Sequence, residues 1–163
     1  MKLLVLALLV ACTRAPVAPH APADPLALLE ASRDLDGTLV GHVAAPTLVV
    51  VFASWCQYCR HEMLELSALR LAHPDARIIG VSYKDLEEYD HRGDAAALRA
   101  FVTTSVPWLR VVTADAALYA ALGSPPQIPT TFVFDARGKL VATWDRRERP
   151  APAAPELAGA LGY

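Results

Sequence analysis

Two cysteines three positions apart constrain this chain more than any other feature. Cys56 and Cys59 lie in the stretch VVFASWCQYCRHEM, directly after the apolar run 47–53 and before residues whose apolar side chains recur at helical spacing. A continuous β-branched run without alternation is typical of a strand covered on both faces. The sequence therefore predicts a strand, a short loop and then a helix that begins at the cysteine pair.

The spacing of the two cysteines fits some kinds of site and not others. Tetrahedral zinc needs four ligands, and the chain has no second cysteine pair. A c-type haem needs Cys-x-x-Cys-His, but Arg60 stands where the histidine would be. A structural disulfide across so short a loop would add little stability. Dithiol chemistry fits best: a helix N-terminus stabilises the thiolate of Cys56, the expected nucleophile, and Cys59 resolves the mixed disulfide.

Composition restricts the class of protein. At 163 residues and 17.5 kDa the chain can form one domain with a normal hydrophobic core. The apolar fraction of 54% and the charged fraction of 20% indicate a folded globule. A net charge of -2 gives no basic field that would attract nucleic acid, so we expect no nucleic-acid partner.

The first residues resemble the leader of a bacterial lipoprotein. Lys2 supplies one positive charge, and the apolar run 3–11 ends in Leu-Val-Ala-Cys, which is similar to the lipobox. The run is about half as long as a helix that spans a bilayer. We therefore expect residues 1–11 to be a signal peptide and Cys12 to be the lipidated first residue of the mature chain.

A proline-rich stretch follows the expected lipid anchor. Proline recurs every third residue, which favours an extended chain and excludes a helix. We expect residues 12–23 to be a tether and residues 24–163 to form the folded domain. Thr13 stands where aspartate would retain the best-known lipoproteins in the inner membrane. The expected location is therefore the periplasmic side of a bacterial membrane, most simply the outer membrane.

Strands and helices alternate along the domain and end in a hairpin. The patterns predict helices over 24–35, 56–72, 94–103 and 115–122, strands over 47–53, 76–83 and 109–113, a hairpin over 130–135 and 139–144, and a final helix after residue 155. This order predicts an α/β fold in which a central mixed β-sheet is flanked by helices on both faces.

Two local predictions concern the surface of this domain. The apolar face of the helix over 56–72 is expected to include, besides its main stripe, Leu64, Ala68 and Leu71. The segment 84–93 is polar and mostly acidic, and we interpret it as a solvated loop.

The motifs together resemble those of a known family. The chain looks like a TlpA/ResA-like protein of thioredoxin-like fold, a family of secreted, membrane-tethered thiol–disulfide oxidoreductases. The resemblance covers residues 36–163 and rests on these stretches: Trp55 to Cys59, Arg60 to Met63, Ile79 to Ser82, Gln127 to Phe132, and Asp135 to Gly138.

The resemblance implies roles for further residues. The Ile128–Pro129 bond would be cis and face the cysteine pair, and the Ile128 backbone would pair with an extended substrate segment. Glu62 would deprotonate the resolving thiol, with a solvated helix glutamate as the alternative. Trp55 would pack beside the disulfide and shape the substrate groove, with ordinary packing as the alternative.

The resemblance also implies partners and leaves the direction of electron flow open. It implies a reductase that uses no cofactor and no metal beyond its Cys56–Cys59 pair, receives electrons from a membrane donor, acts on exported cysteine-containing proteins and works as a monomer. Tyr58 stands where many relatives have proline, which favours a disulfide oxidase or isomerase instead. Val50 stands where classical thioredoxins carry a buried aspartate. A metal-binding chaperone that uses the same cysteines is the non-enzymatic alternative.

Overall fold

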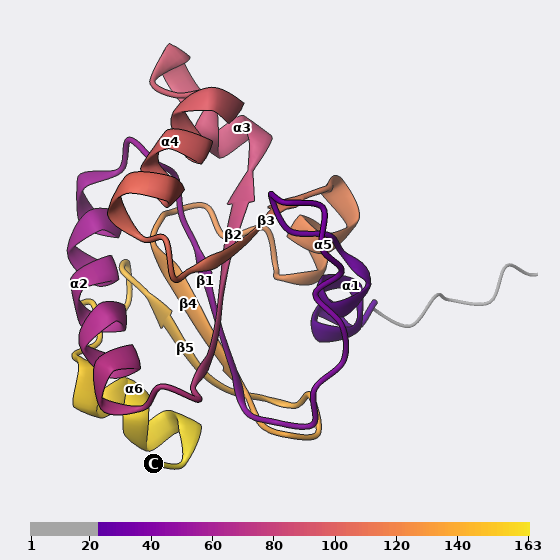
Figure 1. Ribbon diagram of the computed structural model, residues 1–163, viewed down its shortest axis with the longest axis vertical. Coiled ribbons are helices and arrows are strands. Elements are labelled where there is room, and N and C mark those ends of the chain that lie inside the picture. The colour runs from indigo at the N-terminus through magenta and orange to yellow at the C-terminus, as the bar shows by residue number, and fades with distance from the viewer. Residues whose placement is uncertain (1–22) are drawn as a thin grey trace, which may run out of the picture.

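A mixed five-stranded sheet runs through the centre of the computed structural model, which describes residues 23–163 (Figure 1). The strands are β1 (Thr47–Val51), β2 (Arg77–Tyr83), β3 (Arg110–Ala114), β4 (Thr130–Phe134) and β5 (Leu140–Asp145). Their order is β3-β2-β1-β4-β5, with β1, β2 and β3 parallel and β4 and β5 antiparallel to their neighbours. The predicted leader, Cys12 and the tether up to residue 22 lie outside the described residues.

Helices cover both faces of this sheet, as the sequence predicts. They are α1 (Pro25–Ala31), α2 (Gln57–Ala72), α3 (Lys84–Glu87), α4 (Ala95–Ser105), α5 (Ala116–Ala121) and α6 (Ala154–Leu161), with a 3-10 turn, η1, at Tyr89–His91. Figure 1 shows α2, α4 and α6 on one side and α1 and α5 on the other. Aspartates at the N-caps of α1, α4 and α5 accept backbone N–H bonds and so fix where these helices begin.

Strand β1 lies at the middle of the sheet and is fully buried. Leu48, Val50 and Phe52 pack into the core beneath α2, α4 and α6, whereas Val49 and Val51 pack into the core beneath α1 and α5. Successive side chains of a strand point to opposite faces, so a strand covered on both sides must be apolar at every position. This burial explains the unbroken apolar run. Strand β1 ends at Val51, and a short loop then leads to Cys56 at the start of α2.

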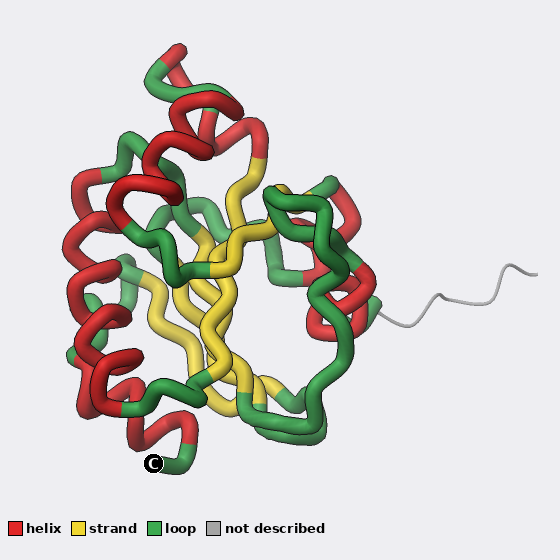
Figure 2. The backbone as a smooth tube through the Cα atoms, viewed as in Figure 1, coloured by secondary structure: helices red, strands yellow, loops and turns green. Residues whose placement is uncertain are grey.

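The first helix is shorter than predicted. It ends at Ala31 rather than near residue 35, because the next residues form a bridge between Arg33 and Leu39. The N–H of Leu35 also donates to the carbonyl of Val111, which ties this turn to β3. Figure 2 shows the long loop that follows α1 and runs to β1. Residues that the sequence pattern assigned to the helix therefore pair with the edge strand β3 instead.

The apolar face of α2 is narrower than predicted. Leu64 is 66% exposed and Leu71 is 84% exposed, and Ala68 is also exposed. The buried positions are Cys59, Glu62, Met63, Leu66 and Leu69. At about 100° per residue, positions 64 and 71 lie more than 100° around the helix from Cys59, beyond the reach of the sheet. The prediction that these three residues broaden the apolar face is wrong.

Candidate active site

The cysteine pair lies where β1 ends and α2 begins. Cys56 is the N-cap residue of α2, and its Sγ accepts the N–H of Cys59 at 3.1 Å. Cys59 lies one turn into the helix and is fully buried, and the two cysteines form a disulfide with their Cα atoms 5.2 Å apart. The N–H of Cys56 donates to the carbonyl of Ala53, which makes the turn between strand and helix. The predicted strand–loop–helix arrangement is confirmed.

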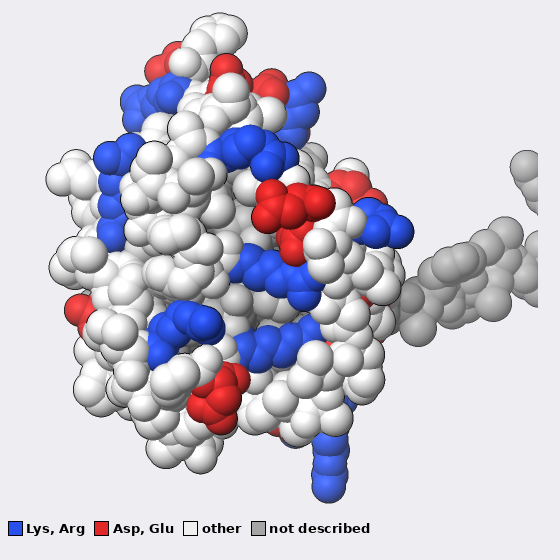
Figure 3. Space-filling model, in the orientation of Figure 1, with Lys and Arg blue, Asp and Glu red and all other residues white. Residues whose placement is uncertain are grey.

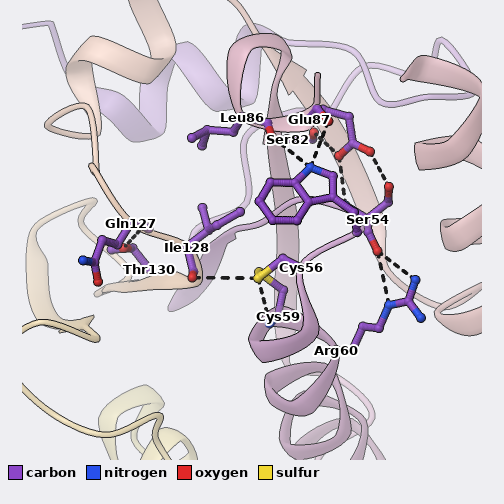
Figure 4. Close-up of a disulfide and its surroundings, with 11 residues drawn as sticks. Ser54, Cys56, Cys59, Arg60, Ser82, Leu86, Glu87, Gln127, Ile128 and Thr130 are labelled. Carbon is purple, nitrogen blue, oxygen red and sulfur yellow. Dashed lines mark hydrogen bonds between the residues drawn. A yellow bond between two sulfur atoms is a disulfide. The ribbon is translucent and has the colours of Figure 1, made fainter. Parts of the chain in front are cut away.

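A cis proline faces the disulfide from the start of β4. The Ile128–Pro129 peptide bond is cis, as the resemblance predicts. The carbonyl oxygen of Ile128 lies 3.8 Å from Cys56 Sγ, on the side of the sulfur away from Ser54 and Glu87 (Figure 4). Thr130 then begins β4, and its hydroxyl donates to the carbonyl of Gln127 at 2.8 Å. A backbone edge beside the sulfur is what an extended substrate segment needs for pairing.

Trp55 is anchored by the backbone of the segment that follows β2. Its indole N–H lies 3.1 Å from the Leu86 carbonyl and 2.9 Å from the Glu87 carbonyl. The ring stacks with Tyr89 at a centroid distance of 6.2 Å, and the Arg92 guanidinium lies 5.0 Å from its centre. Trp55 is therefore held in one orientation directly before Cys56, and it is only partly buried.

A buried carboxylate supports the loop that carries Trp55. Glu87 is only 3% exposed and accepts the N–H of Ser54 at 2.9 Å and the Ser54 hydroxyl, and it lies 3.5 Å from the Ser82 hydroxyl (Figure 4). On the other side of the loop, Arg60 donates to the Ser54 carbonyl at 3.2 Å. The interpretation of segment 84–93 as a solvated loop is wrong in two respects, because the segment contains α3 and the turn η1 and because Glu87 is buried. The glutamates in this segment look alike in sequence, and only the fold brings one of them to Ser54.

Glu62 is buried beneath the cysteine pair, so the solvated alternative is wrong. It is 1% exposed, and its carboxylate accepts the hydroxyl of Thr131. Burial raises the pKa of Glu62, and the Thr131 bond and the charges of Arg146 and His61 oppose that rise. Thr131 pairs with Val50 in the sheet register. Val50 stands where classical thioredoxins carry a buried aspartate, and here the buried carboxyl group near this position is that of Glu62, which comes from α2.

Three further features of residues 23–163 concern metal ligands, helix length and surface charge. Within residues 23–163, no group of three or more His, Cys, Asp or Glu side chains is arranged to hold a metal ion. Over the same residues, no helix has the length and apolar character that crossing a membrane requires. On the face drawn in Figure 3, basic side chains lie among acidic ones and form no continuous basic surface.

Comparison with known proteins relates this site to a family. The AhpC/TSA family model matches residues 34–143. The thiol:disulfide interchange protein DsbE of Pseudomonas aeruginosa is 35% identical over 115 residues, which cover 66% of this chain and 58% of that protein. This chain therefore spans less than two thirds of the length of that curated relative.

Solved structures share the fold at low sequence identity. A secreted Mycobacterium tuberculosis disulfide oxidoreductase homologous to E. coli DsbE has a TM-score of 0.61 at 22% identity, covering 80% of this chain and 92% of that one. StoA from Bacillus subtilis has a TM-score of 0.60 at 16% identity, covering 79% and 92%. The exposed lipoprotein thioredoxin Etrx1 from Streptococcus pneumoniae has a TM-score of 0.62 at 17% identity, covering 80% and 95%. The predicted thioredoxin-like fold is confirmed.

Proposed function

Because the chain belongs to the AhpC/TSA family and has the thioredoxin fold, we propose that it is a TlpA/ResA-like thiol–disulfide oxidoreductase that acts on protein substrates. One observation supports this most directly. The Cys56–Cys59 disulfide lies at the N-terminus of α2 with the backbone edge at Ile128 and Pro129 facing it. The helix end favours a thiolate, and the free edge admits an extended chain.

The proposed reaction is a two-step exchange. The Cys56 thiolate attacks one sulfur of a substrate disulfide, forms a mixed disulfide and releases the other substrate sulfur as a thiolate. The Cys59 thiolate then attacks Cys56 Sγ, which forms the internal disulfide and releases the second substrate thiolate. Two electrons pass from the protein to the substrate. The protein's contributions are the helix N-terminus at Cys56 and the placement of Cys59 one turn away.

Glu62 is the proposed proton acceptor for Cys59. It follows Cys59 by one helical turn on the buried side of α2, with Thr131 as its hydrogen-bond partner. Because burial raises the pKa of its carboxyl group, Glu62 takes up a proton more readily than an exposed glutamate does. Trp55 shapes the substrate groove in this proposal, because its ring is anchored and it directly precedes Cys56 in the chain.

The proposed direction is that of a reductase, which the resemblance to the TlpA/ResA-like family implies. Tyr58 between the cysteines favours the second candidate, a disulfide oxidase or isomerase. A reduction potential of Cys56–Cys59 near -250 mV or lower in a defined thiol buffer supports the reductase. A potential near -120 mV supports the second candidate, because thioredoxin and DsbA mark these two ends of the scale at about -270 and -120 mV.

Location and partners complete the proposal. Residues 1–11 would be removed, Cys12 would carry the lipid, residues 12–23 would act as the tether, and residues 24–163 would form the domain. The protein would act as a monomer on the periplasmic side of the outer membrane, on exported cysteine-containing proteins, with electrons from a membrane donor. Two proteins of the same fold are described as secreted and as an exposed lipoprotein, which supports the extracytoplasmic part of this proposal.

Trapping the mixed disulfide tests the proposed reaction. In a Cys59→Ser variant the second step cannot occur, so we expect covalent complexes with disulfide-containing proteins that thiol reductant releases. A Cys56→Ser variant should form at least about tenfold fewer, because Cys59 is fully enclosed whereas Cys56 is 4% exposed and lies at the N-terminus of α2. Equal trapping by the two variants, or none by either, would overturn the proposed roles.

A further inference from the structure

A hollow lies beside the disulfide between the active-site helix and the end of the sheet. It has a volume of about 350 Å³ and is lined by Tyr58, Gln127, Ile128 and Arg146. Tyr58 lies between the two cysteines and is 61% exposed. Arg146 follows the last residue of β5, and its guanidinium lies 3.6 Å from the centre of the Tyr58 ring. The lining of this hollow therefore includes an arginine whose guanidinium lies over an aromatic ring.

Arg146 differs from the neighbouring arginines in its charge partners. The next residue, Arg147, forms close contacts with Asp145, from 2.5 to 3.1 Å. Arg149 lies 3.8 Å from Glu156. Among residues 23–163, Arg146 is in no salt bridge. The Tyr58 ring orients this guanidinium without neutralising it.

The buried carboxylate nearest in influence, that of Glu62, already has a hydrogen-bond partner in Thr131. The positive charge of Arg146 acts to lower the pKa of Glu62, but the Glu62 carboxylate is buried and accepts the hydroxyl of Thr131. Arg146 itself is half-buried, so its charge is partly shielded from water at the edge of the hollow. A positive charge in this setting attracts an anionic group more strongly than a fully exposed arginine does.

The hollow adjoins the backbone edge at which substrate would pair. Ile128 belongs to both, since its carbonyl faces Cys56 Sγ at 3.8 Å and the residue is part of the lining of the hollow. Thr130 pairs with Asp145 in the sheet register, which brings Arg146 next to Pro129. A segment that pairs along Ile128 with its cysteine at Cys56 would direct a side chain close to that cysteine into the hollow.

We propose that this hollow binds an acidic side chain, Asp or Glu, that lies within two residues of the reactive cysteine in the substrate. The inference rests on the proposed function and adds a substrate class to it. Arg146 supplies the charge, the Gln127 amide supplies a neutral hydrogen-bond donor, and Tyr58 holds the guanidinium in place. The hollow thereby selects substrates by charge at the moment when the mixed disulfide forms.

Three matched peptides test this inference. Each is blocked at both ends, contains one internal disulfide and carries Glu, Gln or Lys beside the same cysteine. The rate constant for reduction by the reduced protein is divided by that for reduction by dithiothreitol, which removes differences intrinsic to each peptide. We expect the order Glu, Gln, Lys, with Glu about fivefold faster than Gln at low salt and the difference reduced in 0.5 M NaCl.

Two variants assign the preference to Arg146. Arg146→Gln should lower the Glu-to-Gln ratio from about fivefold to about one. Arg147→Gln is the control, because it removes one positive charge from the next residue. Asp145 already neutralises Arg147, so this variant should leave the ratio unchanged. Because each result is a ratio of two peptides on one variant, a general loss of stability or activity does not affect it.

The outcomes separate this inference from the proposed function. If all three peptides are reduced at equal normalised rates, the acidic subsite is wrong and the oxidoreductase activity stands. If the preference persists in Arg146→Gln, the charge is recognised elsewhere and the subsite is also wrong. If no peptide is reduced by the wild-type protein although dithiothreitol reduces all three, the proposed function itself fails.

Discussion

The backbone N–H of Ser54 donates to the side-chain carboxylate of Glu87, thirty-three residues later in the chain, at 2.9 Å. This bond joins the loop before Cys56 to the short helix α3, and the Ser54 hydroxyl donates to the same carboxylate. The backbone of Glu87 in turn accepts the indole N–H of Trp55. One residue therefore fixes both the loop and the tryptophan that precede the proposed nucleophile.

Removing the Glu87 carboxylate should destabilise the protein. Glu87→Ala leaves the buried N–H of Ser54 without an acceptor, and we expect a loss of about 2–4 kcal/mol in the free energy of unfolding. Glu87→Gln keeps one acceptor oxygen and should lose about 1 kcal/mol. Urea unfolding of the oxidised protein measures both. The exposed neighbour Glu88 provides the control, since Glu88→Ala should change stability by less than about 0.5 kcal/mol. Equal effects at both positions would contradict the assigned role of Glu87.

Gly93 leaves room for the Glu87 network, so a methyl group there should be unfavourable. A Cβ at this position would lie 2.5 Å from Glu87 Oε1 and 2.9 Å from the Glu87 carbonyl oxygen. We expect Gly93→Ala to destabilise the protein by about 1–3 kcal/mol in thermal or urea unfolding. In α6, Gly159 has nothing within 4 Å of its Cβ position, and Gly159→Ala should stabilise the helix by up to about 1 kcal/mol. A neutral Gly93→Ala variant would show that the loop adjusts freely.

The buried carboxyl of Glu62 should make stability depend on pH. Because burial raises the pKa of Glu62 above its ordinary value of 4.5, the folded protein keeps a proton that the unfolded chain has already released. Glu62 therefore lowers stability increasingly as pH rises from the unfolded pKa through the folded one. Glu62→Gln can still accept the Thr131 bond, so we expect its urea midpoint to exceed that of the wild type near pH 8 and to approach it near pH 4. A constant difference across this range would contradict the shifted pKa.

Reaction with an alkylating reagent should distinguish the two reduced thiols. Cys56 is at the N-terminus of α2, where the Cys59 N–H can stabilise a thiolate, and Cys59 is fully enclosed. We expect iodoacetamide at neutral pH to modify Cys56 at least about tenfold faster than Cys59, as measured by mass spectrometry of peptides. The single variants Cys56→Ser and Cys59→Ser serve as references. Similar rates at the two positions would contradict the assignment of Cys56 as nucleophile.

Local sequence patterns predicted most of the fold because the physics behind them is local. The buried strand at 47–53, the helix from Cys56 and the aspartate-capped helices all follow from periodicity and capping within a few residues. The cis Ile128–Pro129 bond and its place opposite the disulfide followed from the resemblance, and the structure has both.

The errors occur where tertiary contacts decide. Glu87 is buried because Ser54, far away in sequence, provides two donors for its carboxylate, and an acidic segment gives no sign of which glutamate will meet them. Leu64 and Leu71 are exposed because the sheet covers only a narrow stripe of α2. Arg146 was not predicted as a site residue, because its proximity to Tyr58 depends on how β5 ends beside β4.

The elements on the two sides of Cys56 have different consequences for redesign. In Figure 4, Ser54 and Glu87 lie on one side of this cysteine and Gln127 and Ile128 on the other. The Glu87 contacts and the Tyr58–Arg146 pair have no residue in common. Substitutions in unconnected groups of residues usually combine additively. Substitutions at the end of β5 could therefore change which polypeptides the protein prefers. They would leave intact the Glu87 contacts that hold the loop before Cys56.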